Sequence, residues 1–513
     1  MSEMKNNFKS SLTGIIMVIL IMSGCKKADL PSITSIAVTN ITGTSASTGG
    51  NVTSDGGASI IKRGSCWSTS AKPTVSNSIT SDGTGTGTFT SNISGLSEGT
   101  AYHVRAYATN SSGTSYGEDL TFTTIAKATL STTAISAITS SGAAGGGNIS
   151  SDGGASVTER GVCWSLTSNP TVTDSKTSDD SGSGVFTSTI TGLTEGTTYH
   201  LRAYATNSLG TAYGEDISFK TLAKPTLTTT IISGITISSI LTGGNIATDG
   251  GATVTSRGMC WALTQNPTLA DNKTSDGTGA GIFSSNITGL TPNTPYYLRS
   301  YATNSVGTSY GNELTFTTFA VMDIDGNGYH SKLIGTQTWL IENLRTTHYL
   351  NGDPIPNVTD NTQWYNLTSG AYCFKNNDTS VPAVLGVLYN WYTTNDSRNL
   401  CPTGWHVSTD SEWDDLVSFL GGTGTAGGKM KLPGTLYWMS PNTGADNSSG
   451  FSGISGGQRG IDGNFFDGAG CFWTSTPENA TNARDWFLVW NYASVTRYWD
   501  KKVDGFNIRC VKD

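Results

Sequence analysis

The stretch GLSEGTAYHVRAYATNSSG, residues 95–113, alternates apolar and polar residues between two glycine-containing turns. A side-chain period of two is typical of a β-strand with one buried face. The stretch TYHLRAYATN repeats this pattern at residues 198–207, and Tyr102, Tyr199 and Tyr296 follow one another at intervals of 97 residues. A repeat of this length can bury a core of its own. The sequence therefore predicts three successive antiparallel β-sandwiches.

The three copies span residues 33–124, 128–221 and 225–318. In each copy, the approach to the tyrosine strand closely resembles strand F of fibronectin type III domains. That resemblance implies a tyrosine corner, in which the hydroxyl of Tyr102 bonds back to the turn near Leu96. No catalytic constellation recurs among the copies, so we expect the array to act as a spacer.

Each copy carries a single cysteine, which directly precedes a tryptophan. One cysteine per module cannot form an internal disulfide, and a metal site would need more ligands nearby. We therefore interpret Cys66, Cys163 and Cys260 as small buried hydrophobic residues. The histidine after the strand tyrosine, His103 in the first copy, becomes Tyr297 in the third. We expect this position to be an outward-facing strand residue rather than a ligand.

The amino terminus reads as an export signal. Two lysines precede a short apolar run, residues 15–22, and two small residues then lead to Cys25. The stretch IMSGCKK resembles the lipobox of bacterial lipoproteins, which implies cleavage before Cys25 and lipidation of that residue. We expect a signal peptide at 1–24, a lipidated tether at 25–32, and an outer-membrane lipoprotein at the cell surface. An ordinary secretory signal with an incidental cysteine is the alternative.

The composition favours a mainly β protein. Charged residues make up 13 % of the chain and Gly accounts for 63 of 513 residues, which favours turns and strands over helices. The net charge of -8 argues against a nucleic-acid partner. The expected partners are the membrane, through the lipid anchor, and a polysaccharide or a surface protein.

A sequence similar to a calcium loop begins at residue 323. In MDIDGNGYHSKLI, Asp323, Asp325 and Asn327 occupy positions one, three and five of the EF-hand template. Position twelve, however, is Ile334, where an EF-hand needs a bidentate Glu. Asp-Gly-Asn-Gly between apolar residues is instead a strong hairpin-turn signal. We predict a hairpin turn, with bound calcium as the alternative, and expect no cofactor.

A different domain follows the repeats, at residues 321–513. The blocks DIDGNGYHSKLIGTQTWLIENLRTTHYLNGDPI, CPTGWHVSTDSEWDDLVSFLGG and GFNIRCVKD resemble the Fibrobacter succinogenes major paralogous domain, and they occur in that family's order. The resemblance implies a compact α+β domain related to the C-type lectin-like and formylglycine-generating-enzyme folds. The residues also predict one helix, since Thr409 and Glu412 form a capping box before an apolar face.

Four cysteines lie in this last domain, and export makes disulfides permissible. Four cysteines allow three connectivities. The resemblance to the lectin-like layout implies that Cys401 pairs with Cys510, because the segment before the helix is tied there to the last strand. Cys373 and Cys471 then remain as the second pair.

Ten of the 13 tryptophans lie in the last domain, and we expect six or seven of them to be core. Aromatic faces also suit sugars, which present apolar C–H patches on one side. Trp438 lies in a turn-rich stretch without periodicity, and Trp490 and Trp499 flank the final turn. We predict that these three rings are exposed and face a ligand.

Three functions are compatible with this organisation. The best supported is a lipid-anchored surface protein whose β-sandwich stalk presents a carbohydrate- or protein-binding head for adhesion or glycan capture. The second is a structural subunit of a surface layer or fibre. An enzyme of the formylglycine-generating type is the least supported, because such enzymes use a closely spaced cysteine pair, whereas Cys471 and Cys510 are far apart in sequence. We therefore expect no enzymatic activity and assign no catalytic residue.

Overall fold

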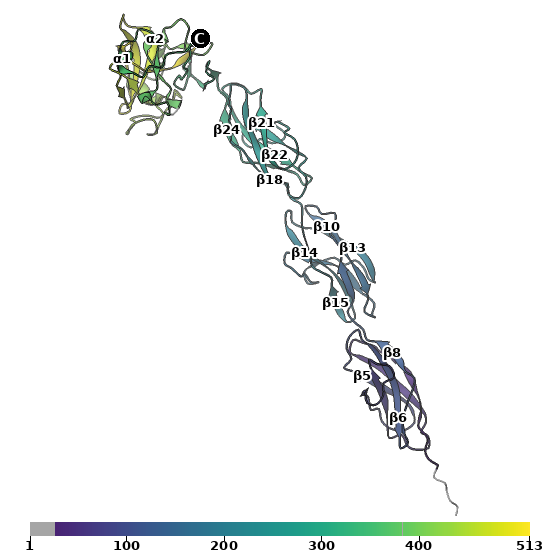
Figure 1. Ribbon diagram of the computed structural model, residues 1–513. Coiled ribbons are helices and arrows are strands. Elements are labelled where there is room, and N and C mark those ends of the chain that lie inside the picture. Colours follow the sequence, from purple (N-terminus) through teal and green to yellow (C-terminus); the bar gives the residue numbers. More distant parts are fainter. Residues whose placement is uncertain (1–25, 382) are drawn as a thin grey trace, which may run out of the picture. The chain divides into compact units, whose positions relative to one another are not determined.

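The computed structural model describes residues 26–381 and 383–513 (Figure 1). The predicted lipidation site, Cys25, and the signal peptide before it lie outside the described residues. The chain divides into two compact units, one ending at Leu222 and the other running from Ala223 to Asp513. None of the helices in the described part is long and apolar enough to cross a membrane.

The first repeat forms two antiparallel sheets. One sheet has the strand order β1-β2-β5, and the other has the order β4-β3-β6-β7, with β8 also pairing with β6. The strands are β1 (Ser32–Thr39), β2 (Ser45–Ser54), β3 (Lys62–Ser68), β4 (Ser78–Ile79), β5 (Gly87–Ser94), β6 (Ala101–Asn110), β7 (Gly113–Tyr116) and β8 (Leu120–Thr123).

The second and third repeats reproduce this strand order. The strands of the second are β9 (Thr129–Thr132), β10 (Gly142–Ser151), β11 (Glu159–Ser165), β12 (Ser175–Lys176), β13 (Gly184–Thr191), β14 (Thr198–Asn207), β15 (Gly210–Tyr213) and β16 (Ile217–Lys220). Those of the third are β17 (Thr226–Thr229), β18 (Ile240–Thr248), β19 (Ser256–Ala262), β20 (Asn272–Lys273), β21 (Gly281–Ile287), β22 (Pro295–Thr303), β23 (Thr308–Tyr310) and β24 (Leu314–Thr317).

The predicted tyrosine corner is present in every copy. The hydroxyl of Tyr102 accepts a hydrogen bond from the backbone N–H of Ser97 at 3.1 Å. Equivalent bonds join Tyr199 to Thr194 and Tyr296 to Thr291. Each bond fixes the turn before the tyrosine strand while the ring packs into the sandwich core. The prediction of tandem fibronectin III-like sandwiches is therefore confirmed.

The repeat cysteines are buried thiols, as predicted. The Sγ of Cys66 lies 3.3 Å from the carbonyl of Pro73, and burial raises the pKa of this thiol to about 11. The repeat histidine is only half-buried, and Nδ1 of His103 lies 3.1 Å from the carboxylate of Asp119. It therefore makes a local side-chain contact on the sandwich surface.

The C-terminal domain contains short strands and, among residues 26–381 and 383–513, all of the helices (Figure 1). Its main sheets have the orders β27-β28-β38-β31 and β36-β35-β34-β37. The strands are β25 (Val321–Met322), β26 (Gly328–Tyr329), β27 (Ser331–Ile334), β28 (Gln337–Leu340), β29 (Tyr372–Cys373), β30 (Leu388–Tyr389), β31 (Trp405–Val407), β32 (Gln458–Arg459), β33 (Phe465–Phe466), β34 (Ala469–Pro477), β35 (Asn482–Val489), β36 (Val495–Lys501), β37 (Asn507–Ile508) and β38 (Cys510–Lys512). The helices are α1 (Asn361–Tyr365), α2 (Trp391–Thr394), α3 (Asp410–Phe419) and α4 (Thr423–Met430), with short 3₁₀ turns at Lys375–Asn377 and Ala383–Leu385.

Helix α3 is the helix predicted from the capping box. The Thr409 side chain accepts the N–H of Glu412, and the Glu412 carboxylate accepts the N–H of Thr409. Trp413 on its inner face is fully buried and stacks on Trp486, with ring centroids 5.9 Å apart. The capping box thus fixes the start of the helix that covers one half of the core.

Helix α4 was not predicted, because its sequence TGTAGGKM is rich in glycine, which disfavours helices. Two of its glycines are required by close packing. A Cβ at Gly427 would lie 2.2 Å from the carbonyl oxygen of Ser494, and one at Gly428 would lie 2.4 Å from that of Gly444. Tertiary contacts therefore outweigh the low helix propensity of this segment.

One disulfide joins Cys401 to Cys510, the pair that the lectin-like resemblance implied. It ties the segment before β31 to the last strand, β38. The second predicted pair is wrong, since Cys373 and Cys471 are both free and buried. Cys373 packs in a small cluster with Trp364, whereas Cys471 belongs to the main core and donates to Oε1 of Gln458 at 3.0 Å. The two thiols are held in different clusters and do not meet.

Candidate functional site

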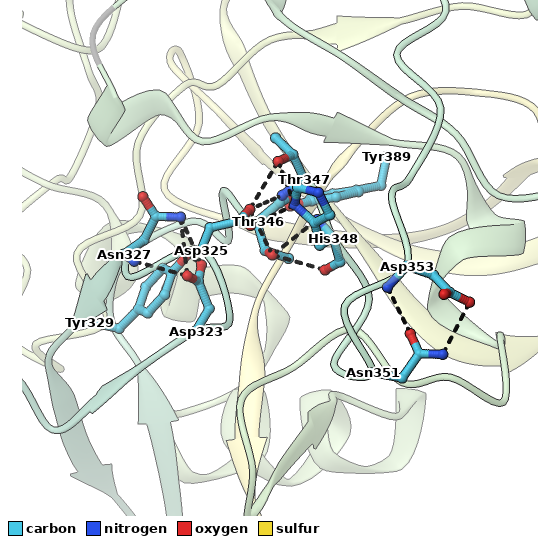
Figure 2. Close-up of polar contacts among 10 residues, drawn as sticks. All are labelled: Asp323, Asp325, Asn327, Tyr329, Thr346, Thr347, His348, Asn351, Asp353 and Tyr389. Atoms are coloured by element: carbon cyan, nitrogen blue, oxygen red, sulfur yellow. Dashed lines mark hydrogen bonds and ion pairs between the residues drawn. The ribbon is translucent and has the colours of Figure 1, made fainter.

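The calcium-like motif forms a hairpin turn, as predicted. Strand β25 pairs antiparallel with β26, and the N–H of Asp323 donates to the carbonyl of Asn327 at 2.9 Å. The Asp323 carboxylate accepts the hydroxyl of Tyr329 at 2.6 Å and the side-chain amide of Asn327 at 2.9 Å (Figure 2). Tyr329 is fully buried. The carboxylate therefore anchors the turn to the core.

Asp325, the second carboxylate of the motif, contacts a different segment, residues 346–348 (Figure 2). Asp325 accepts the N–H of Thr347 at 2.5 Å and lies 2.6 Å from Nδ1 of His348. Burial opposes ionisation of this carboxyl, but the hydrogen bonds from Thr347 and His348 outweigh it and lower the pKa of Asp325. Within residues 26–381 and 383–513, no three His, Cys, Asp or Glu side chains are grouped so that they could hold one ion.

The three candidate tryptophans have three different environments. Trp438 is only 3 % exposed, so the prediction that its ring is exposed is wrong. Its indole N–H donates to the carbonyl of Gly453 at 3.0 Å, and the ring packs in the same cluster as Trp413. Trp490 is half-buried beside that cluster, whereas Trp499 on β36 is 53 % exposed. In all, eight of the ten tryptophans of the domain are buried, more than predicted.

A hollow of about 720 Å³ nevertheless lies beside Trp438. We call it the Trp438 hollow. The segment 435–440 lines it, together with the two 3₁₀ turns and the turn before β34. Its principal lining residues are Lys375, Leu385, Leu436, Tyr437, Met439 and Asp467. Leu436 and Met439 are exposed, so the hollow combines apolar lining residues with the charged groups of Lys375 and Asp467.

A buried lysine fixes the wall of this hollow. The Nζ of Lys431 donates to the carbonyls of Thr443, Val489 and Tyr492 at 3.0, 2.9 and 2.7 Å. Burial lowers the pKa of Lys431 to about 8. Asn442 adds two hydrogen bonds to backbone carbonyls of the same loop. These contacts hold an otherwise irregular segment in one conformation, which is what a preformed binding site requires.

The lining of the Trp438 hollow includes an ion pair. Nζ of Lys375 lies 2.5 Å from Oδ1 of Asp467, whose side chain is mostly exposed. Gly468 follows with φ of +88°, and a Cβ there would lie 2.8 Å from the ring of Trp490 and 3.0 Å from Sδ of Met439. Only glycine allows this approach. Trp438 thus lines the hollow and Trp490 packs against Gly468 next to it, while Trp499 lies on a separate strand.

The sequence patterns did not reveal several buried charged groups of the C-terminal domain. Arg509 is fully buried and donates to the carbonyls of Leu340, Phe451 and Ser452, and Arg459 is held in the same way by the carbonyls of Val358 and Thr359. Their acceptors are distant in sequence and are backbone atoms, so no local motif signals them. The Lys375–Asp467 pair is likewise long-range.

The described part of the chain is therefore a mainly β multidomain protein, with three fibronectin III-like sandwiches and an α+β domain that carries an open hollow. The family model of the Fibrobacter succinogenes major domain matches residues 333–512, which is less than half of the chain. A crystal structure of the FN1–FN3 domains of chicken CNTN1 is similar at 14 % identity and a TM-score of 0.22, covering 56 % of this chain and 98 % of that chain. The sandwich assignment rests on the strand order and not on this low score. No curated protein matches the chain.

Proposed function

We propose that this protein is a lipid-anchored surface protein of the outer membrane that presents its C-terminal domain as a carbohydrate-binding head for adhesion or glycan capture. The β-sandwich repeats serve as the spacer and the anchor is Cys25. The Fibrobacter succinogenes major domain match and the fibronectin III-like repeats support a surface, adhesion-type protein. We propose a binding role rather than an enzymatic one.

The observation that carries the proposal is the Trp438 hollow. A sugar ring offers an apolar face of C–H groups and a rim of hydroxyls. Tyr437 and the aliphatic wall suit the face, while the exposed carboxylate of Asp467 and the ammonium of Lys375 suit the hydroxyls. A pocket held rigid by Lys431 loses little conformational entropy when a ligand binds.

The test is a glycan array probed with the full chain, made soluble by the Cys25→Ser substitution. We expect binding to at least one polysaccharide class. Tyr437→Ala and Asp467→Ala should each weaken it by about tenfold or more, since each removes a main contact of a small site. Tyr365→Ala is the matched control, because Tyr365 is an exposed aromatic residue on α1, outside the hollow.

Two results would contradict the proposal: no glycan binding at all, or binding that both hollow variants leave unchanged. A host-protein array probed in parallel covers the alternative that the head binds a surface protein. Open-ended self-association without any ligand would instead favour the structural-subunit function.

A further inference from the structure

Strand β36 is the edge of its sheet, next to β35, and no strand of the described residues pairs with its other side. Residues 496–499 are exposed, and Tyr498 and Trp499 are each more than half exposed. An edge with exposed aromatic side chains and unpaired backbone groups is a template for another strand.

The register shows which backbone groups of β36 point outward. The N–H of Lys502 donates to the carbonyl of Thr481 at 3.0 Å, in register with the β35–β36 pairs. Residues of an antiparallel strand alternate between the two neighbouring sides. Thr496, Tyr498 and Asp500 therefore bond to β35, and the N–H and C=O groups of Arg497 and Trp499 point away from it.

The other side of β35 agrees with this assignment. The N–H of Trp490 donates to the carbonyl of Gly468 at 3.1 Å, so the even-numbered residues of β35 face β34 and the odd-numbered ones face β36. Both ends of the free edge are closed. The N–H of Lys501 donates to the Asp504 carboxylate at 3.0 Å, and Val495 is buried. The open groups are thus the two N–H and two C=O groups of Arg497 and Trp499.

We propose that β36 pairs antiparallel with β36 of a second copy of this chain, about a two-fold axis at Tyr498. In that register, Arg497 is opposite Trp499 of the second copy, and each such pair exchanges two hydrogen bonds. The two-fold axis also places Trp499 opposite Arg497 of the second copy. The two pairs together form four hydrogen bonds, which use every open N–H and C=O group of both strands. Tyr498 lies opposite its own counterpart at the non-hydrogen-bonded position between the two pairs.

The side chains are compatible with this self-pairing. Arg497 lies opposite an indole, an arrangement that permits a cation–π contact. Its guanidinium pairs with Asp410, which also accepts the Trp486 indole N–H, and lies 3.3 Å from Asp414. On the other face, Thr496 lies opposite Asp500 and can donate to it. No like charges face each other, and such cross-strand pairs stabilise a sheet.

This contact uses the same strand in both copies, so a third copy has no free β36 edge to pair with and the assembly stops at a dimer. It gives a dimer of heads and not a fibre, and it leaves the Trp438 hollow outside the contact. The inference therefore stands or falls independently of the proposed glycan binding.

The first experiment measures the mass of the soluble full chain by analytical ultracentrifugation over a concentration series. We expect a monomer–dimer equilibrium. Trp499→Pro removes an outward N–H without touching a β35 hydrogen bond, and edge strands tolerate proline there. It should raise the dimer Kd by about tenfold or more, because the symmetry doubles the loss. Trp499→Thr keeps the N–H and is the matched control, with a smaller effect.

The second experiment does not depend on a proline variant folding. Tyr498→Cys places two cysteines opposite each other at a non-hydrogen-bonded pair, where the Cβ atoms are close enough for a disulfide. The native unpaired cysteines of the described residues are buried. Mild oxidation should produce a covalent dimer of the full chain. Tyr365→Cys, at an equally exposed position on α1, should not. A monomer at all concentrations, a dimer unaffected by Trp499→Pro, or equal cross-linking of both cysteine variants would overturn the proposal.

Discussion

Asp485 should make the C-terminal domain lose stability as the pH rises towards and above neutrality. This residue lies on β35, is fully buried, and neither carboxylate oxygen has a hydrogen-bond partner among the described residues. Burial, together with the neighbouring Asp500 and Asp504, raises the pKa of Asp485 to about 9. The folded domain therefore holds this side chain as the neutral acid at physiological pH.

The sign follows from the two pKa values. The unfolded chain has an Asp pKa of about 4, so between about pH 4 and pH 9 the folded state binds one more proton than the unfolded state. The contribution of Asp485 to the free energy of unfolding is fully present below this window. It falls by about 1.4 kcal/mol for each pH unit as the pH rises through the window. From pH 5.5 to 7.5 the loss is about 3 kcal/mol, a large share of the stability of one domain.

The perturbation is Asp485→Asn, which keeps the shape and removes the titration. Urea unfolding followed by tryptophan fluorescence reports mainly this domain, because ten of the 13 tryptophans lie in it. Wild type should lose stability between pH 5.5 and 7.5, and the variant should lose about 3 kcal/mol less. The pKa values of Asp500, Asp504, His330 and His406 are raised as well and act in the same direction, so the difference between the two proteins is the measured quantity.

Asp415→Asn, an exposed change on α3, is the control and should keep the wild-type slope. If Asp485→Asn also retains that slope, Asp485 is ionised in the folded protein and the reasoning is wrong.

Three further predictions concern the anchor, the disulfide and the tryptophans. Cys25→Ser should abolish palmitate labelling and release the protein from the membrane fraction; a variant that stays labelled contradicts the lipobox interpretation. Non-reducing peptide mapping should find the Cys401–Cys510 link, and replacing both residues with Ser should cost up to about 4–5 kcal/mol for a closed loop of about 110 residues; a peptide linking either of them to another cysteine would refute this. Trp438→Ala should cost about 3–5 kcal/mol and lower the melting temperature, whereas Trp499→Ala should melt within a few degrees of wild type, because only the first ring is buried; equal losses would contradict these environments.

Much of the fold could be predicted from the sequence because the signals are local or periodic. The alternation around Tyr102, repeated at a fixed interval, predicts strands, and the resemblance to fibronectin type III domains implies a hydroxyl contact with the preceding turn; the structure contains both. The capping box at Thr409 specifies a helix start within four residues. The Asp-Gly-Asn-Gly turn is equally short-range, so the conformation of Asp323 is fixed mainly by its immediate neighbours.

The candidate site, in contrast, was decided by contacts between distant segments. Trp438 lies in a stretch with the composition of an exposed loop, yet Lys431 and the carbonyls of residues 443, 489 and 492 hold that loop against the core. A loop-like composition around a tryptophan therefore does not determine whether its ring is buried or exposed. Which cysteines meet is also a property of the packed clusters, and the second pair failed for this reason.

The sequence by itself determined the strand pattern and the first long helix of the last domain, since these depend on residues within a few positions of one another. The 97-residue repetition determined the number of sandwiches, and the fibronectin III resemblance implied their tyrosine corners. Only the tertiary structure decided which tryptophans are exposed, where the hollow lies, that helix α4 forms, and that Asp485 is buried without a partner. Burial is a sum over neighbours from the whole domain. A side chain's own sequence context contains only a small part of that sum.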